Sequence, residues 1–220
     1  WYRRGASPAA TGIIARRRPL LAATMPSSLL FTPLTLRGVT LRNRTVVSPM
    51  CQYSAVDGFA NDWHFVHLGQ FAMGGFGLVF TEATAVLPDA RITHGDLGLW
   101  EDAHIAPVRR IAEYVHAQGA AFGMQLAHAG RKASMQRPWF GNAALGAADH
   151  ARGDRPWPIV GPVAQPHMPG WLVPAALTRE AIAHIVQAFA DTARRADAAD
   201  VDALEVHGAH GYLVHSFLSP

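Results

Sequence analysis

The chain has 220 residues, of which 50% are hydrophobic and 16% are charged, a composition that can bury the core of one ordinary domain. No apolar run approaches the roughly 18 residues that a membrane-spanning helix needs, so no membrane association is expected. The formal net charge is +3, but residues 1–24 hold five arginines and no acid. Removing these five from the 19 Lys and Arg leaves 14 basic against 16 acidic residues, which argues against nucleic-acid binding.

Residues 1–27 precede the first patterned segment and are expected to be a disordered or translated upstream extension. A tail rich in Arg and Ala also fits an organelle transit peptide, although the simpler interpretation is preferred. The single cysteine, Cys51, rules out a disulfide framework within the chain and fits a reducing compartment. A cytoplasmic location is therefore expected.

Strand and helix patterns alternate along the rest of the chain. Residues 34–41 alternate about Arg37-Gly38, which predicts a hairpin, and the β-rich run 44–48 is stopped by Pro49. The elements expected next are a helix capped by Asp62 and ended by Gly74-Gly75, a strand over 78–82, a helix from about Pro107 to Gly119, a strand over 121–126, a helix capped by Thr178 and a strand over 203–206. The apolar face of the last helix is expected to comprise Ile182, Ile185, Val186, Phe189 and Ala193.

This alternation of apolar strands and helices predicts a parallel α/β sheet, either doubly wound or closed into a barrel. The pattern alone does not choose between the two. Residues 131–177 follow the third strand of the rhythm and are rich in Pro, Gly and Trp. They are too long for an ordinary loop and are expected to form a lid-like insertion within one domain over residues 28–220.

Polar side chains follow each of the four strands. Ligands gather at the carboxyl ends of parallel strands, so these positions are the candidate site. The four segments are Ser48–Tyr53, Glu82–Thr84, Gln125–Lys132 and Glu205–Tyr212. All four contain side chains with hydrogen-bond donors or acceptors, which is more than strand termination requires.

Two of these residues have simple alternatives to a role in chemistry. The amide of Gln125 offers a donor and an acceptor side by side, as a heterocyclic ring edge requires, but it also fits an ordinary polar strand end. Cys51 stands beside Met50, and a lone cysteine is usually a small buried hydrophobic residue.

His207 and His210 stand three residues apart beside glycines that allow the backbone to turn toward a ligand. Three roles fit such a pair: a structural contact, two ligands of a metal, or two donors to one substrate oxygen. The second role predicts a metal-dependent barrel hydrolase, with His128 or His215 as a third ligand.

The segments SPMCQYSA, WHFVHLGQFAMGG, EATAV, QLAHAGRKAS and EVHGAHGYLVHSFLSP, in this order and spacing, resemble the signature segments of the Old Yellow Enzyme family. The resemblance runs from about residue 28 to residue 220. The cysteine and the RKAS-x-x-RPW run are most similar to the bacterial branch that includes xenobiotic reductases. It implies a (β/α)8 TIM barrel, of which about the first four βα units are present here as an N-terminal fragment.

The resemblance also implies an activity. Members of the family are NADPH dehydrogenases or NADH:flavin oxidoreductases that use FMN to pass hydride from NADPH or NADH to an activated alkene. Such alkenes include α,β-unsaturated carbonyl compounds, quinones and nitro compounds. Carried over by position, the flavin contacts are Pro49, Met50, Cys51, Ala83 and Gln125.

The remaining roles fall on residues after the first and fourth strands. Tyr53, His207 and His210 would bind the substrate, with the two histidines at its carbonyl oxygen, and Tyr212 would act as the general acid. The resemblance implies no metal ion and a complete enzyme that is a homodimer or homotetramer. The fragment alone is expected to be inactive, because the phosphate site of such barrels is usually built from the loops after strands seven and eight.

Overall fold

Four parallel strands form the centre of the structure, a computed structural model that describes residues 28–219. They are β3 (Val46–Val47), β4 (Leu78–Ala85), β5 (Ala121–Ala127) and β8 (Ala203–Val206), in that order across one sheet. Strands that follow one another in the chain are therefore neighbours in space, whereas a doubly wound sheet reverses its order at a switch point. This order is that of a barrel wall. The expectation for residues 1–27 lies outside the described residues.

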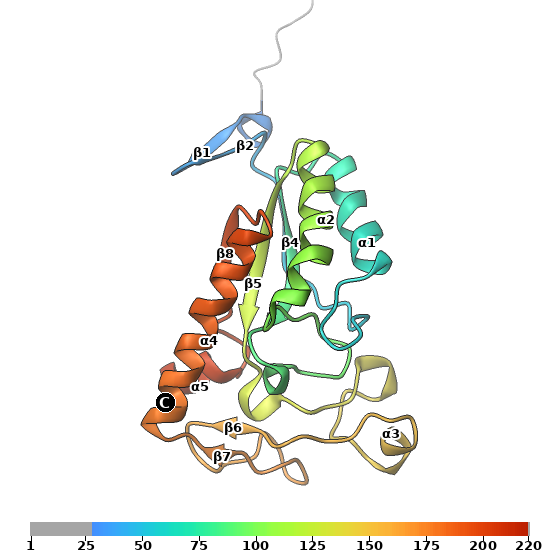
Figure 1. Ribbon diagram of the computed structural model, residues 1–220, viewed down its shortest axis with the longest axis vertical. Coiled ribbons are helices and arrows are strands. Elements are labelled where there is room, and N and C mark those ends of the chain that lie inside the picture. The colour runs from blue at the N-terminus through green and yellow to red at the C-terminus, as the bar shows by residue number, and fades with distance from the viewer. Residues whose placement is uncertain (1–27, 220) are drawn as a thin grey trace, which may run out of the picture.

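Helices connect these strands, as the alternating pattern predicts. They are α1 (Asp62–Met73), α2 (Ile105–Ala117) and α4 (Arg179–Ala198), and α5 (Leu213–Leu218) follows β8. Figure 1 shows α1, α2 and α4 running alongside the strands. Within residues 28–219, no helix combines the length and the apolar character needed to cross a bilayer.

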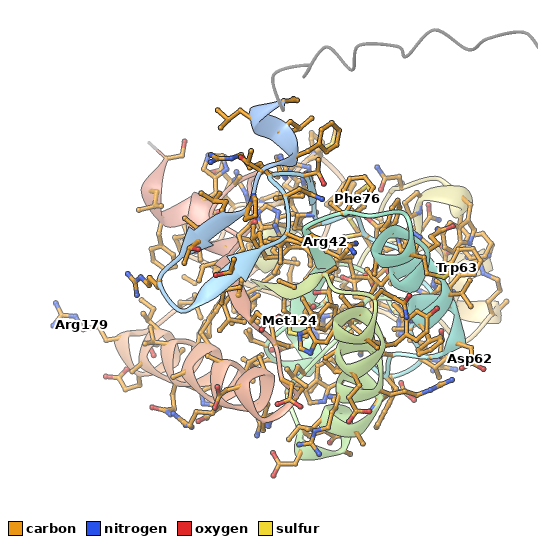
Figure 2. The ribbon with its side chains drawn as sticks, turned by 90° about the horizontal axis from the view of Figure 1, so that it is seen from above. Arg42, Asp62, Trp63, Phe76, Met124 and Arg179 are labelled. Atoms are coloured by element: carbon orange, nitrogen blue, oxygen red, sulfur yellow. The ribbon has the colours of Figure 1, made fainter. Side chains whose placement is uncertain are left out.

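The main hydrophobic core lies between the sheet and its helices. Phe122 and Met124 on β5 are fully buried, and they share one face because side chains alternate along a strand. Val108 on α2 belongs to the same buried cluster, and Met124 lies near the centre of the molecule in Figure 2. Full burial of such side chains stabilises the fold by roughly 1.5–3 kcal/mol each. This layer holds the strands against the helices and leaves the other face of the sheet for different contacts.

The cap expected for α1 is wrong by one residue. Asn61 caps the helix, and its side chain accepts a hydrogen bond from the Trp63 N–H at 3.0 Å. Asp62 is the first helical residue, and its carboxylate instead accepts a hydrogen bond from Arg110 at 2.8 Å. Figure 2 shows Asp62 and Trp63 side by side at this end of α1. Asn and Asp are equally good caps, so two adjacent candidates left the position ambiguous.

The cap expected for α4 is confirmed, but its apolar face is wrong in part. Thr178 Oγ1 accepts a hydrogen bond from the Ala181 N–H at 3.2 Å. Val186 is 63% exposed. The buried stripe consists of Ile185, Ala188, Thr192 and Ala196. Phe189 and Ala193 also pack against the main core, as expected. An open groove between α4 and α5 is lined by Ile182, Val186, Phe189, Leu213 and Phe217. Sequence periodicity could not separate the core from this groove because both surfaces are apolar.

The long segment after β5 is folded against the carboxyl end of the sheet. It contains α3 (Ala147–Ala151), β6 (Val160–Gly161) and β7 (Ala175–Ala176), and β6 pairs with β7. Figure 1 shows these elements beyond the end toward which β5 points. Trp157 Nε1 donates a hydrogen bond to the Asp89 carbonyl in the loop after β4 at 3.0 Å. The segment therefore lies at the same end of the sheet as the polar strand ends.

As expected, residues 34–41 form an antiparallel hairpin, of β1 (Leu34–Leu36) and β2 (Val39–Leu41). It lies at the opposite end of the sheet (Figure 1). Arg42 follows the hairpin, and its guanidinium donates to the carbonyl oxygens of Ala72 at 2.7 Å, Phe76 at 3.0 Å and Gln118 at 2.6 Å. Figure 2 shows Arg42 beside Phe76. These carbonyls belong to the end of α1 and to the turns after α1 and α2. One side chain thus joins two βα units.

We expect Arg42→Ala to lower the free energy of unfolding by about 2–4 kcal/mol, because three carbonyl groups lose a charged donor. Urea denaturation of the natural protein measures this change. The control is Arg44→Ala, at an exposed side chain whose Nε donates to Thr32 Oγ1 at 3.3 Å. This control should lower the free energy by less than about 0.5 kcal/mol. Equal effects of the two substitutions would contradict the role given to Arg42.

Candidate functional site

One row of residues crosses the sheet near its carboxyl end. Ala83 on β4 pairs with Gln125 on β5, and Gln125 pairs with Glu205 on β8. Gln125 is 8% exposed, and its Nε2 donates to Glu205 Oε1 at 2.6 Å. Since side chains alternate along β5, Gln125 faces away from Phe122 and Met124. The row therefore presents polar groups on the face of the sheet opposite the hydrophobic core.

The loop after β3 carries Pro49, Met50 and Cys51. Met50 is 47% exposed. Cys51 packs against a small apolar cluster composed of Ile92, Ala129, Ala133, Met135 and Ile159. Burial raises the pKa of the Cys51 thiol to about 12, and the negative charges of Asp96 and Glu82 add to the rise. Cys51 is therefore a thiol at neutral pH and not a thiolate.

Tyr53 stands next to this loop in a constrained backbone conformation. Its φ is 51°, in the left-handed region that non-glycine residues seldom adopt. Gly95 approaches so closely that a Cβ there would lie 2.1 Å from the Tyr53 carbonyl oxygen. The Tyr53 ring meets the edge of Trp139, from the segment 131–177, at 6.1 Å between centroids. Burial raises the pKa of Tyr53, so its hydroxyl keeps its proton.

Three aromatic side chains cluster in the loop after β8. The His207 ring centroid lies 5.1 Å from that of His210 and 4.9 Å from that of Tyr212. His210 has a φ of 58°, a conformation that costs roughly 1–2 kcal/mol for an L-residue. The loop therefore turns sharply at His210 and brings both histidines beside Tyr212.

Protonation at this cluster favours hydrogen-bond donation. His207 Nδ1 accepts a hydrogen bond from the Ala209 N–H at 3.3 Å. Burial and the charge of His210 lower the pKa of His207, so the ring is neutral with its proton on Nε2. Burial raises the pKa of Tyr212 above its usual range, with smaller contributions from Cys51 and Asp96. His207 and Tyr212 therefore each have a hydrogen to donate at neutral pH.

Lys132 connects this cluster to the loop after β5. Its Nζ donates to the His210 carbonyl oxygen at 3.0 Å and lies 4.9 Å from the centroid of the Tyr212 ring. A cation over an aromatic face contributes about 0.5–1 kcal/mol at a partly exposed site. Lys132 thus helps to fix both the strained turn and the ring of Tyr212.

The structure gathers the expected residues at one end of the sheet. Cys51 and Tyr212 pack against the same small apolar cluster although 160 residues separate them. Ala83 and Gln125 lie in the polar row, and Pro49 and Met50 adjoin Cys51. The residues thus lie where the sequence predicted, while the role of each remains a prediction.

The metal-site alternative finds little support. His128 Nδ1 accepts a hydrogen bond from the Gly130 N–H at 3.1 Å, and His215 Nδ1 accepts one from the Gly211 N–H at 2.6 Å. Within residues 28–219, no group of three or more His, Cys, Asp or Glu side chains could hold a metal ion. Each of the two expected third ligands is thus held in a local turn through its Nδ1 atom.

Sequence reasoning missed one residue that shapes the site and gave no individual role to two others. Glu205 and Lys132 both lie in the strand-end segments, and Glu205 stands two positions before His207, where strand residues share a face. Asp96 had no signal, because an acidic residue in a loop usually faces water, yet this one is only 3% exposed.

Comparisons with known proteins give the family. The model of the NADH:flavin oxidoreductase / NADH oxidase family matches residues 29–220. An NADH:flavin oxidoreductase of Gibberella zeae is 47% identical over 209 residues, which are 94% of this chain and 50% of that protein. An NADPH dehydrogenase of Bacillus subtilis is 40% identical over 193 residues, 87% of this chain and 51% of that protein. The chain belongs to the NADH:flavin oxidoreductase / NADH oxidase family.

Similar solved structures point to the same family. Old Yellow Enzyme from Pichia sp. has a TM-score of 0.73 and 26% identity, covering 87% of this chain and 49% of that one. Morphinone reductase has a TM-score of 0.69 and 29% identity, and the match covers 84% of this chain and 49% of morphinone reductase. The resemblance to Old Yellow Enzymes is confirmed, and so is the α/β barrel with about half of its units present. The chain spans about half the length of the curated relatives it matches.

Asp96 gives the site a titratable group that can be tested through stability. Its Oδ2 accepts from the Ile92 N–H at 2.6 Å, and its Oδ1 accepts from the Thr93 N–H at 3.0 Å and the Thr93 hydroxyl at 2.8 Å. Burial nevertheless raises its pKa from 3.8 to about 7. The folded state therefore binds this proton more tightly than the unfolded chain does.

Because the pKa of Asp96 is raised, its contribution to stability is full below about pH 4 and is lost as the pH rises to about 7. We expect Asp96→Asn, which cannot ionise, to remove this loss. The thermal midpoint of the natural protein minus that of the variant should therefore decrease as the pH rises from 4.5 to 7.5. Asp89→Asn, at an exposed side chain, is the matched control. Parallel pH curves for the natural protein and Asp96→Asn would contradict the assigned direction.

Proposed function

We propose that the complete protein is an FMN-dependent NAD(P)H oxidoreductase that reduces the carbon–carbon double bond of activated alkenes. The observation that carries the proposal is the meeting of a polar strand-end row with the donors of His207 and Tyr212 at one end of the sheet. Family membership supports the same activity. The expected substrates are α,β-unsaturated carbonyl compounds, quinones and nitro compounds.

The strand ends fit a flavin in their chemistry. The Gln125 amide can both donate to and accept from the pyrimidine edge of the ring. The exposed Met50 and the neutral Cys51 thiol offer an apolar, polarisable surface beside it, with Pro49 and the Ala83 backbone completing the contacts. Bound FMN would supply the hydride chemistry, taking hydride from NADPH or NADH and delivering it to the alkene.

The chain's own residues would stabilise the charge that develops during reduction. Hydride addition to the β-carbon moves negative charge onto the carbonyl or nitro oxygen, where the N–H groups of His207 and His210 can donate. Tyr212 holds its proton at neutral pH and can give it to the α-carbon. Tyr53, from the loop after β3, would also contact the substrate.

The setting of the reaction is also a proposal. The branch resemblance supports a homodimer or homotetramer, and the lone cysteine fits the cytoplasm. Residues 1–220 alone should lack tight FMN binding, because β3 and β8 are edges of the described sheet. Leu204 and Val206 on β8 are 44% and 57% exposed, so apolar side chains at this sheet edge remain in contact with solvent.

The activity is tested with the full natural protein and the 220-residue chain side by side. We expect the full protein to purify yellow, to bleach when NADPH is added without oxygen, and to recover its colour with 2-cyclohexenone. The short chain should retain little flavin after gel filtration. A colourless full protein that loses activity with a chelator would favour the metal-dependent hydrolase instead.

Substitutions after β8 test the assigned roles. We expect His207→Ala to slow reoxidation of the reduced flavin by 2-cyclohexenone about 10²-fold or more, the usual effect of removing one donor to a developing oxyanion. Tyr212→Phe should slow substrate protonation by ~10²-fold, as for a general acid. Stopped-flow absorbance measures both rates, and reduction by NADPH serves as the internal control. Loss of flavin instead of turnover would mean that these residues are structural.

A further inference from the structure

Glu82 is a carboxylate buried beneath the loop that carries Cys51. It belongs to β4, and the whole residue is 4% exposed. Its Oε1 lies 3.1 Å from His64 Nε2 on α1. The side chains alone of Glu82 and His64 are each 2% exposed. Its Oε2 accepts a short hydrogen bond from the Gln52 N–H. A buried carboxylate persists only where such partners compensate for its lost hydration, and one of these partners is the backbone directly after Cys51.

The start of α1 holds the same loop from a second side. Asn61 Nδ2 donates to the Ser54 carbonyl oxygen at 2.7 Å, and Trp63 Nε1 donates to Gln52 Oε1 at 3.1 Å. His64 Nδ1 lies 3.0 Å from Asn61 Oδ1, so the ring of His64 joins Asn61 to the buried carboxylate. Residues 52–54 are therefore tied both to β4 and to the amino end of α1.

We propose that Glu82, oriented by His64 and Asn61, is a positioning residue that fixes the Met50–Tyr53 loop against the cofactor site. It acts through the Gln52 N–H and through its charge, and it touches neither the flavin nor the substrate. That the loop borders a cofactor rests on the function proposed above. That Glu82 fixes the loop does not rest on that function, because it depends only on contacts within the described residues.

The charge of Glu82 adds an effect that a neutral acceptor would lack. Negative groups near Cys51 disfavour its thiolate, and they come from two elements, Asp96 in the loop after β4 and Glu82 on β4 itself. Tyr53 and Tyr212 also face the thiol, and both keep their protons because burial raises their pKa values. Removing the charge of Glu82 should therefore lower the pKa of Cys51, while removing the hydrogen bond should loosen the loop.

Two substitutions separate these effects. In Glu82→Gln, the amide carbonyl oxygen can accept the Gln52 N–H. The amide N–H can donate to His64 Nε2 once the ring carries its proton on Nδ1, where Asn61 Oδ1 lies 3.0 Å away, so the bonds persist without the charge. We expect alkylation of Cys51 by iodoacetamide at pH 8 to rise roughly 3- to 10-fold, since one nearby charge is removed. Hydrogen exchange of the Gln52 amide should stay near its natural rate.

In Glu82→Ala, both the acceptor and the charge are lost. Exchange of the Gln52 amide should rise roughly 10- to 100-fold, the range expected for a hydrogen bond to a charged group. Both experiments use the full natural protein and mass spectrometry of peptides. Overlapping peptides isolate exchange of the Gln52 amide, and the added mass on Cys51 reports its alkylation. Glu113→Gln and Glu113→Ala, at an exposed position on α2, are the matched controls.

Asn61→Ser provides a test if the Glu82 variants fail to fold. Serine still caps α1, but its short hydroxyl does not reach the Ser54 carbonyl as the amide does. We expect faster Gln52 exchange, roughly 3- to 10-fold, without the increase in Cys51 alkylation that follows loss of the charge. Unchanged exchange in both Glu82→Ala and Asn61→Ser would overturn the proposal, and unchanged alkylation in Glu82→Gln would overturn the additional effect of its charge.

These readouts also separate this proposal from the proposed function. Neither exchange nor alkylation requires flavin or turnover. A natural protein that lacks FMN would refute the oxidoreductase activity, while the measurements on Gln52 and Cys51 would still decide the role of Glu82. If FMN is bound, reduction by NADPH should slow in Glu82→Ala more than in Glu82→Gln. Equal rates in these two variants would contradict the positioning of the loop against the cofactor.

Discussion

Parallel pairing in chain order is the constraint on which the candidate site depends. Because β3, β4, β5 and β8 run in the same direction and lie side by side, the four loops that follow them emerge at one end of the sheet. The register then aligns Ala83, Gln125 and Glu205 into a single row. Residues far apart in the chain, such as Cys51 and Tyr212, meet against one apolar cluster as a result.

Burial at that end of the sheet keeps protons on several groups that could otherwise ionise. The pKa of Cys51 is raised to about 12, those of Tyr53 and Tyr212 are also raised, and that of His207 is lowered, in each case chiefly by loss of hydration. All four groups are therefore neutral at physiological pH. A site of this kind suits a reaction that needs hydrogen-bond donors and a proton source more than one that needs an ionised nucleophile.

The sequence was sufficient for the order of the elements and for the strand ends, because both follow from local patterns of period two and period 3.6. It was insufficient where two local solutions were equivalent, as with Asn61 and Asp62 at the start of α1, or where two apolar surfaces compete, as on α4. Buried acids were the hardest to recognise. Asp96 acquires its environment only when the loop after β4 folds against Tyr53, and no local pattern encodes that contact.

The position of Arg42 has a consequence for how the chain opens. Its three carbonyl partners come from segments 30, 34 and 76 residues away in the sequence, and they lie at the end of the sheet remote from the polar row. Fraying at the end of α1 or in the turn after α2 must break bonds to the same guanidinium. The first two βα units are therefore mechanically coupled and should open as one cooperative unit. Rigidity at that end leaves the loops at the other end free to differ in sequence without loosening the barrel wall.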